Sequence, residues 1–217
     1  MNYTLIVAFS FSITGAAVIA CIRAKKVSTD FIPFLLTVSL AFFNEVASFI
    51  ISKAGYSTNI NNNIYILLES LLITWQFQRW GLFERGKKWY YGILIFYILF
   101  WTFDFFIIHT ITYVSSYFRI AYSYITVIMS ISIINRLIIH ERACLLKNSI
   151  FLVCFAFIIY YTYKVLLEVF WVNGLNASRV FRMKVYDLYA CINLFANLIY
   201  ALAVLWMPRK LPYIRLL

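Results

Sequence analysis

Residues 149–172 read SIFLVCFAFIIYYTYKVLLEVFWV, a stretch that carries charge at only two positions, Lys164 and Glu168. A bilayer core about 30 Å thick needs roughly 20 mostly apolar residues in a helix, so this stretch is able to cross a membrane. Six further runs of this kind lie between charged or turn residues. The sequence therefore predicts an all-α integral membrane protein, a single domain of seven transmembrane helices at about residues 3–22, 31–51, 63–83, 89–108, 117–139, 149–172 and 185–207.

The composition supports this fold class and excludes others. Of the 217 residues, 64% are apolar and 12% are charged, and the mean hydropathy is +0.85. Soluble domains are nearer half apolar and a quarter charged, and disordered chains are less hydrophobic still, so a cytosolic enzyme and a disordered chain are both excluded. The formal charge of +11 falls largely in short connections between apolar runs, where membrane orientation explains it. We therefore expect a lipid bilayer as partner and no nucleic acid.

The distribution of Lys and Arg predicts the orientation, because cytoplasmic loops are enriched in positive charge. The first run has no Lys or Arg before it, which is the reverse of a cleavable signal peptide. If the N-terminus lies outside, four basic residues fall in outer segments, whereas thirteen fall in inner ones. We expect the N-terminus outside, the C-terminus inside, and a multi-pass protein of a plasma or inner membrane. The outer residues are Lys53, Arg179, Arg182 and Lys184; the inner ones are Arg23, Lys25, Lys26, Arg79, Arg85, Lys87, Lys88, Arg136, Arg142, Lys147, Arg209, Lys210 and Arg215.

Motifs for metals, nucleotides and redox chemistry are missing from the sequence. There is no CxxC pair and no Gly-rich phosphate loop, so neither a cofactor nor a metal is predicted. The segment that starts at His140 begins like HExxH but has Cys144 at the second ligand position, and His109 is predicted on the opposite membrane face. Asn2 and Asn176 begin N-x-[ST] sequons on the predicted outer side, which matter only if the host glycosylates.

Ionisable groups within the predicted helices indicate a polar cavity. Such groups cost at least ~2.5–3.5 kcal/mol each on insertion scales, so they usually face the bundle interior and mark function. Five acids and two bases fall in the outer half, and helical spacing places other polar residues on the same faces. We expect an outward-opening cavity walled by Tyr and Trp, with a formal charge of −3 that favours a cation, and an inner half closed by apolar packing with Thr74, Gln76, Ser130 and Asn135. The candidate ligand-binding or proton-relay residues are Asn44, Glu45, Glu69, Asp104, Arg119, Tyr122, Lys164, Glu168, Asp187, Asn193 and Asn197.

Lys164 and Glu168 lie one helical turn apart and allow two interpretations. They can pair with each other, although Glu preceding Lys is the better order for an intrahelical pair. Alternatively, Lys164 reaches across the cavity to Glu45 or Glu69 and leaves Glu168 for a ligand. We favour the second arrangement as a hypothesis.

Three functions fit these features. The first is a receptor-like or sensory protein that binds a small ligand in the outer cavity, where the charge favours a cation, and signals to a cytoplasmic protein at the basic loops. The second is a small-solute or proton-coupled transporter of the three-plus-one-plus-three type. A membrane-embedded lipid enzyme is the third, but no nucleophile or metal set is visible. The predicted inner half lacks ionisable groups, which a carrier would need on both sides, so we favour the receptor. Purely structural pairing of the buried charges is the alternative to all three.

Overall fold

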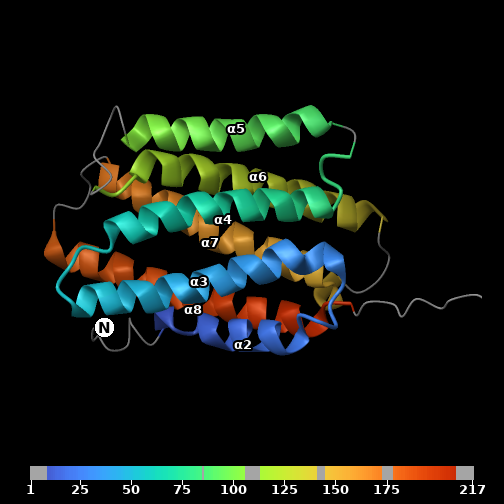
Figure 1. Ribbon diagram of the computed structural model, residues 1–217, viewed down its shortest axis with the longest axis horizontal. Helices are drawn as coiled ribbons and strands as arrows, with labels where there is room; N and C mark the ends of the chain where they lie inside the picture. Colours follow the sequence, from blue (N-terminus) through green and yellow to red (C-terminus); the bar gives the residue numbers. More distant parts are fainter. Residues whose placement is uncertain (1–8, 85, 106–112, 141–144, 173–177, 209–217) are drawn as a thin grey trace, which may run out of the picture.

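The apolar runs form α-helices in the computed structural model, which describes residues 9–84, 86–105, 113–140, 145–172 and 178–208. Within these ranges there are α-helices and short 3-10 turns and no β-strand, so the all-helical prediction is confirmed for the described residues (Figure 1). The helices are α2 (Ile13–Arg23), α3 (Ile32–Lys53), α4 (Asn59–Arg79), α5 (Lys87–Phe103), α6 (Ser116–His140), α7 (Ser149–Val172) and α8 (Arg179–Trp206).

Four helical stretches are long and apolar enough to cross a membrane: Thr29–Lys53, Ser116–Ile139, Ser149–Val172 and Val180–Trp206. The other three helices are too short or not apolar enough to be counted as spans by this criterion. Helix α2 is 11 residues long and α5 is 17 residues long. Helix α4 has 21 residues but is rich in Asn, Gln and other polar residues, which lowers its hydropathy. The structure therefore supports a membrane protein with at least these four candidate spans.

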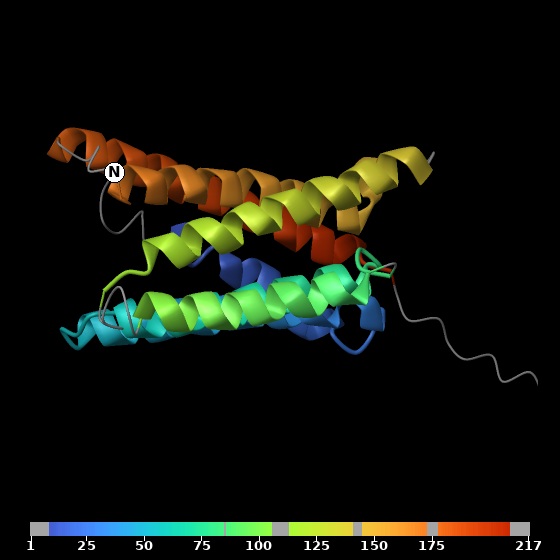
Figure 2. The same cartoon turned by 90° about the horizontal axis from the view of Figure 1, so that it is seen from above.

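The helices form a ring in which chain neighbours pack side by side. Helix α2 packs against α3, α3 against α4, and α4 against α6. Helix α6 packs against α7, α7 against α8, and α8 against α2, which closes the ring. Helix α5 lies at the edge of the bundle against α4 and α6. Figure 2 shows two layers, α3–α4–α5 and α6–α7–α8, and α8 ends nearer to the first layer than it begins.

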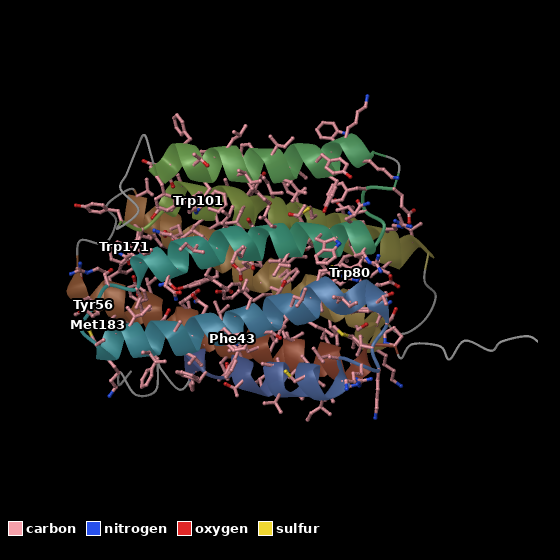
Figure 3. The ribbon with its side chains drawn as sticks, in the orientation of Figure 1. Phe43, Tyr56, Trp80, Trp101, Trp171 and Met183 are labelled. Atoms are coloured by element: carbon pink, nitrogen blue, oxygen red, sulfur yellow. The ribbon has the colours of Figure 1, made fainter. Side chains whose placement is uncertain are left out.

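The two ends of the bundle differ, and they are called the cavity end and the basic end. At the cavity end, α3, α5 and α7 finish and α4, α6 and α8 begin; at the basic end, α2, α4 and α6 finish and α3, α5 and α7 begin. Trp171 lies at the cavity end and Trp80 at the basic end, as Figure 3 shows.

Backbone groups at the basic end are satisfied by side chains from distant segments. The first N–H groups of a helix lack partners within it, and α3 begins with Pro33 near its N-terminus. The buried Gln76 amide meets this need, because its Oε1 accepts from Phe34 N at 2.7 Å and its Nε2 donates to Asp30 O at 2.6 Å. The Arg23 guanidinium similarly donates to the last carbonyls of α8, including Val204 O at 2.6 Å.

An aromatic floor closes the middle of the bundle, made of the buried side chains of Phe34, Phe77 and Phe157. The Phe34 ring centroid lies 6.2 Å from that of Phe157, which lies 6.1 Å from that of Phe77. Tyr161 and Tyr200 pack on Phe157 with centroids 5.6 and 5.8 Å away. These rings come from α3, α4, α7 and α8, so they fill the ring of helices from several sides.

The polar residues expected in the inner half are buried, with one exception. Thr74, Gln76 and Ser130 are buried, whereas Asn135 is exposed, so the prediction for Asn135 is wrong. The inward face of α6 passes through Ser130 and Ile133, both buried. Asn135 lies about 200° around the helix from Ile133, at roughly 100° per residue, and therefore points outward.

Candidate ligand-binding site

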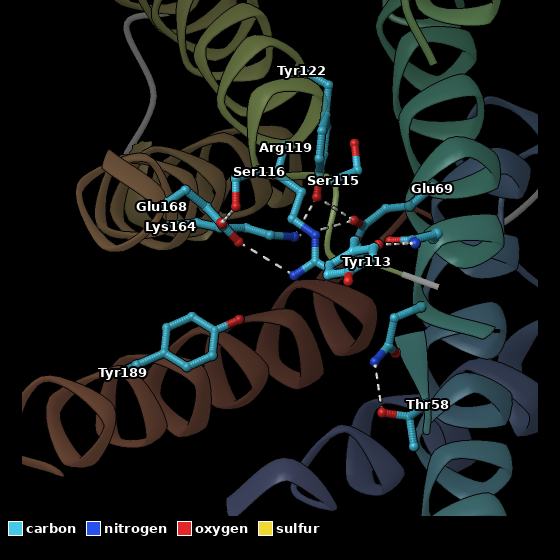
Figure 4. A network of polar contacts seen from close by, with 12 residues as sticks. Thr58, Glu69, Tyr113, Ser115, Ser116, Arg119, Tyr122, Lys164, Glu168 and Tyr189 are labelled. Carbon is cyan, nitrogen blue, oxygen red and sulfur yellow. Dashed lines mark hydrogen bonds and ion pairs between the residues drawn. The ribbon is translucent and has the colours of Figure 1, made fainter. Parts of the chain in front are cut away.

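A buried carboxylate, Glu69 on α4, is the centre of the first charged network (Figure 4). It accepts hydrogen bonds from Tyr65 Oη at 2.6 Å and from Tyr122 Oη at 2.8 Å. Lys164 Nζ of α7 lies 3.7 Å from Glu69 Oε2 and donates to Tyr122 Oη. The side chains of Glu69 and Lys164 are 6% and 8% exposed, so the pair is largely removed from solvent. This network joins α4, α6 and α7.

A second network joins α6 to α7 through Glu168. Arg119 Nη1 lies 3.3 Å from Glu168 Oε1, and Ser116 Oγ donates to Glu168 Oε2 at 2.7 Å. Ser116 and Arg119 are three residues apart in the first turn of α6, so both reach the same carboxylate.

The two networks decide between the interpretations of Lys164 and Glu168. Each residue pairs with another helix, and the predicted contact between Lys164 and Glu69 is confirmed. The expectation that Glu168 stays available for a ligand is wrong, because Ser116 and Arg119 engage both of its oxygens. Ser116 lies just before the predicted helix 117–139, whereas α6 begins at Ser116, so the sequence pattern did not place its hydroxyl beside Glu168.

A cavity of about 220 Å³ lies beside the first network and is enclosed by α2, α3, α4, α7 and α8, with Arg119 of α6 at its edge. Five tyrosines form much of its wall: Tyr65, Tyr160, Tyr161, Tyr189 and Tyr200. A bond joins two of them, since Tyr160 Oη and Tyr189 Oη are 2.7 Å apart. Of the predicted candidates, the lining includes Asn44, Glu45, Glu69, Arg119, Lys164, Asn193 and Asn197.

A second cavity, of about 580 Å³, lies between α6, α7 and α8 at the cavity end. Its lining includes Glu168 and Trp171. Arg119, Lys164 and Tyr189 line both cavities, so they form a partition between them. Two of these three residues, Arg119 and Lys164, are charged and are held by the two networks.

Glu45 differs from the other acids of the site. It is half-buried on α3 and lines the smaller cavity. Glu69 and Glu168 are paired with bases. Within the described part of the chain, Glu45 makes neither a hydrogen bond nor an ion pair.

Asp104 and Asp187 line neither of these two cavities. Asp104 is fully buried at the end of α5 and accepts a hydrogen bond from Ser115 Oγ. Asp187 is half-buried on α8, turned about 100° from its neighbour Tyr186, which lines the larger cavity. The cavities therefore hold the acids Glu45, Glu69 and Glu168 and the bases Arg119 and Lys164. Their formal charge is −1, and the predicted value of −3 is wrong.

Tyr122 lies behind the cavity wall and lines neither cavity, although it bonds both Glu69 and Lys164. Asn197 donates to Ser12 Oγ at 2.8 Å and to Asn193 Oδ1 at 3.5 Å, which connects α8 to the start of the described chain. These residues hold the wall in position.

An amide cluster between α3 and α4 is the part of the site that the sequence analysis missed. Asn61 Nδ2 donates to Asn44 Oδ1 at 2.8 Å and to Ser48 Oγ at 3.0 Å, and Asn44 Nδ2 donates to Asn62 Oδ1 at 3.3 Å. The predicted helix began at residue 63, whereas α4 begins at Asn59. The spacing of Asn62, Tyr65 and Glu69 on one helical face was the signal that would have revealed it.

Some sequence candidates lie outside the described residues, namely the sequon asparagines Asn2 and Asn176, His109 and the segment 141–144. Among the side chains that the structure describes, no three from His, Cys, Asp and Glu come together to form a possible metal site.

Comparison of the chain with models of known protein families, with curated proteins and with solved structures gave no match. The fold and the site by themselves define the class: a helical protein with four described candidate membrane spans and an aromatic, charged cavity in its bundle.

Proposed function

We propose that this protein is a receptor-like or sensory seven-helix membrane protein that binds a small solute in the cavity of about 220 Å³. The observation that carries the proposal is that Lys164 lines this cavity while it bonds to α4 and α6. A solute that competes for Lys164 changes the contacts between three helices. The cavity is smaller than the roughly 300–1,000 Å³ typical of drug-sized ligands, which favours a small solute.

The exposed faces of α4 and α5 support these two helices as further spans besides the four long apolar ones. Helix α4 turns polar side chains such as Glu69 and Gln76 inward and exposes Ile64 and Leu68. Helix α5 exposes Ile95 and Leu99, among other apolar residues. A helix with polar groups inside the bundle and an apolar outer face suits a bilayer even when its mean hydropathy is modest.

The charges at the basic end support a cytoplasmic location for that end. Its described basic residues are Arg23, Lys25, Lys26, Arg79, Lys87, Lys88, Arg136 and Lys147, and the described acids there are Asp30 and Glu84. By the positive-inside rule the basic end is cytoplasmic, the cavity end is outside, and the N-terminus is outside. Its exposed basic loops are also where a cytoplasmic protein partner would bind.

The location of the buried charges favours sensing over transport. In the part of the chain that the structure describes, the buried charged residues are Glu69, Asp104, Lys164 and Glu168, and they lie between the middle of the bundle and the cavity end. The other half is closed by the aromatic floor and the Gln76 contacts. A carrier exposes one site alternately to both sides, so it needs a path through this packing.

The test is solute binding and uptake by the purified full-length chain in proteoliposomes, with radiolabelled choline, succinate, glycine and glucose. We expect saturable binding of at least one solute at about one per chain, without further accumulation. Lys164→Met should change the affinity, whereas Lys147→Met, at an exposed position of the basic end, should not. Uptake well above the bound amount would establish a transporter instead, and no saturable binding of any of the four would overturn the proposal.

A further inference from the structure

We infer that the ligand of this cavity is a small organic ammonium ion and that Glu45 is its counter-ion. This inference rests on the proposed binding function and gives it a chemical class.

The first support is the balance of charge in the two cavities. Glu69 is paired with Lys164, and Glu168 is paired with Arg119. Glu45 lines the smaller cavity without a bond to any described residue. A carboxylate that is partly removed from water is stabilised by a partner of opposite charge, so a ligand with one positive charge completes the site.

The second support is the aromatic wall. Aromatic faces attract ammonium groups within about 6 Å of the ring centroid. The cavity already holds one such group, because Lys164 Nζ lies 5.5 Å from the ring centroids of both Tyr160 and Tyr161. Tyr65, Tyr189 and Tyr200 line the same cavity and provide further ring surface for a second ammonium.

The neighbouring amides argue against a metal cation. Ca²⁺ takes six to eight oxygen ligands, and Mg²⁺ requires an octahedral set. Two amide oxygens of the cavity lining are already hydrogen-bond acceptors, since Asn44 Oδ1 accepts from Asn61 and Asn62 Oδ1 accepts from Asn44 and Ser48. One free carboxylate among tyrosine rings suits an organic cation better than a hard metal ion.

The experiment measures binding of two ammonium ions and their neutral analogues by calorimetry at constant ionic strength. The pairs are choline with 3,3-dimethylbutan-1-ol and n-butylammonium with n-butanol, and NaCl and CaCl₂ are tested separately. We expect at least one ammonium to bind at least tenfold more tightly than its neutral analogue and than the metal ions. Equal binding of an ammonium and its neutral analogue would overturn the inference.

Variants of Glu45 test its role. Glu45→Gln should weaken ammonium binding about tenfold or more, because an interaction with a charged partner is lost, whereas Glu45→Asp should retain part of it. Glu45 bonds to no described residue, so both variants should fold, and thermal unfolding checks this. The matched control is Glu84→Gln, since the Glu84 side chain is 70% exposed at the basic end. An unchanged affinity in folded Glu45→Gln would contradict the assignment.

The result separates this inference from the proposed function. If succinate or glucose binds without accumulating and the ammonium ions do not bind, the receptor proposal stands and the ammonium inference fails. If an ammonium ion binds through Glu45 and accumulates in proteoliposomes, the ligand class stands and the receptor proposal fails.

Discussion

Replacing Lys164 by Met removes a buried charge from the first network while keeping a similar side-chain length. Lys164 Nζ lies 3.7 Å from Glu69 Oε2, and both side chains are largely shielded from water. Opposite charges about 4 Å apart interact by roughly 4 kcal/mol at an effective dielectric constant of ~20, and breaking a buried pair costs roughly 3–5 kcal/mol. In this variant Glu69 keeps its hydrogen bonds from Tyr65 and Tyr122, which offset part of the cost of losing Lys164. We therefore expect a loss of about 3 kcal/mol, at the lower end of that range.

The assay is reversible unfolding in mixed micelles for Lys164→Met, Glu69→Gln and the double variant. For a chain of this size, ~3 kcal/mol corresponds to a fall in Tm of about 6–12 °C by the soluble-protein scaling. The double variant should lose less than the sum of the single losses, by about 2 kcal/mol, because neither charge is left unpaired. Lys147→Met should change stability by less than ~0.5 kcal/mol. A loss below ~1 kcal/mol in Lys164→Met, or strict additivity in the double variant, would refute the coupling.

Three other predictions concern the second network, the Gln76 contacts and the orientation in the membrane. Glu168→Gln should lower the free energy of unfolding by about 1.5–3 kcal/mol, because Arg119 loses a charged partner, and calorimetric unfolding that matches the wild type would contradict this. Gln76→Ala should cost about 2 kcal/mol, since two short hydrogen bonds to backbone groups disappear, and chemical denaturation in detergent measures it. In intact cells, Cys at Lys53 should react with an impermeant maleimide and Cys at Lys147 should not; labelling of both or only of the second would refute the orientation.

The helices were predictable because each depends on local hydrophobicity and a 3.6-residue period. The segment 149–172 illustrates this, since α7 has the predicted bounds. The partner of Lys164 could be narrowed to Glu45 or Glu69 by depth, but the choice between them depends on how α3 and α4 are rotated. The prediction that Glu168 stays available for a ligand was wrong for the same reason. Its partners lie on α6, and a local sequence pattern does not indicate which faces of two helices are in contact. Asn135 shows the limit within one helix, where a polar residue at the right depth lies on the wrong face.

The attachment of α7 at two heights has a mechanical consequence. Lys164 bonds to Glu69 of α4 and to Tyr122 of α6, Glu168 bonds to Ser116 and Arg119 of α6, and four residues separate Lys164 from Glu168 by about 6 Å along the axis. A movement of α7 along its axis lengthens both the Lys164–Glu69 and the Glu168–Arg119 ion pairs. A rotation of α7 that shortens one of them lengthens the other, because the two pairs reach different helices. Small displacements are therefore resisted, and a large one requires both pairs to open at once. Under the proposed receptor function, α7 would respond to a bound solute as a threshold element, all-or-none instead of graded.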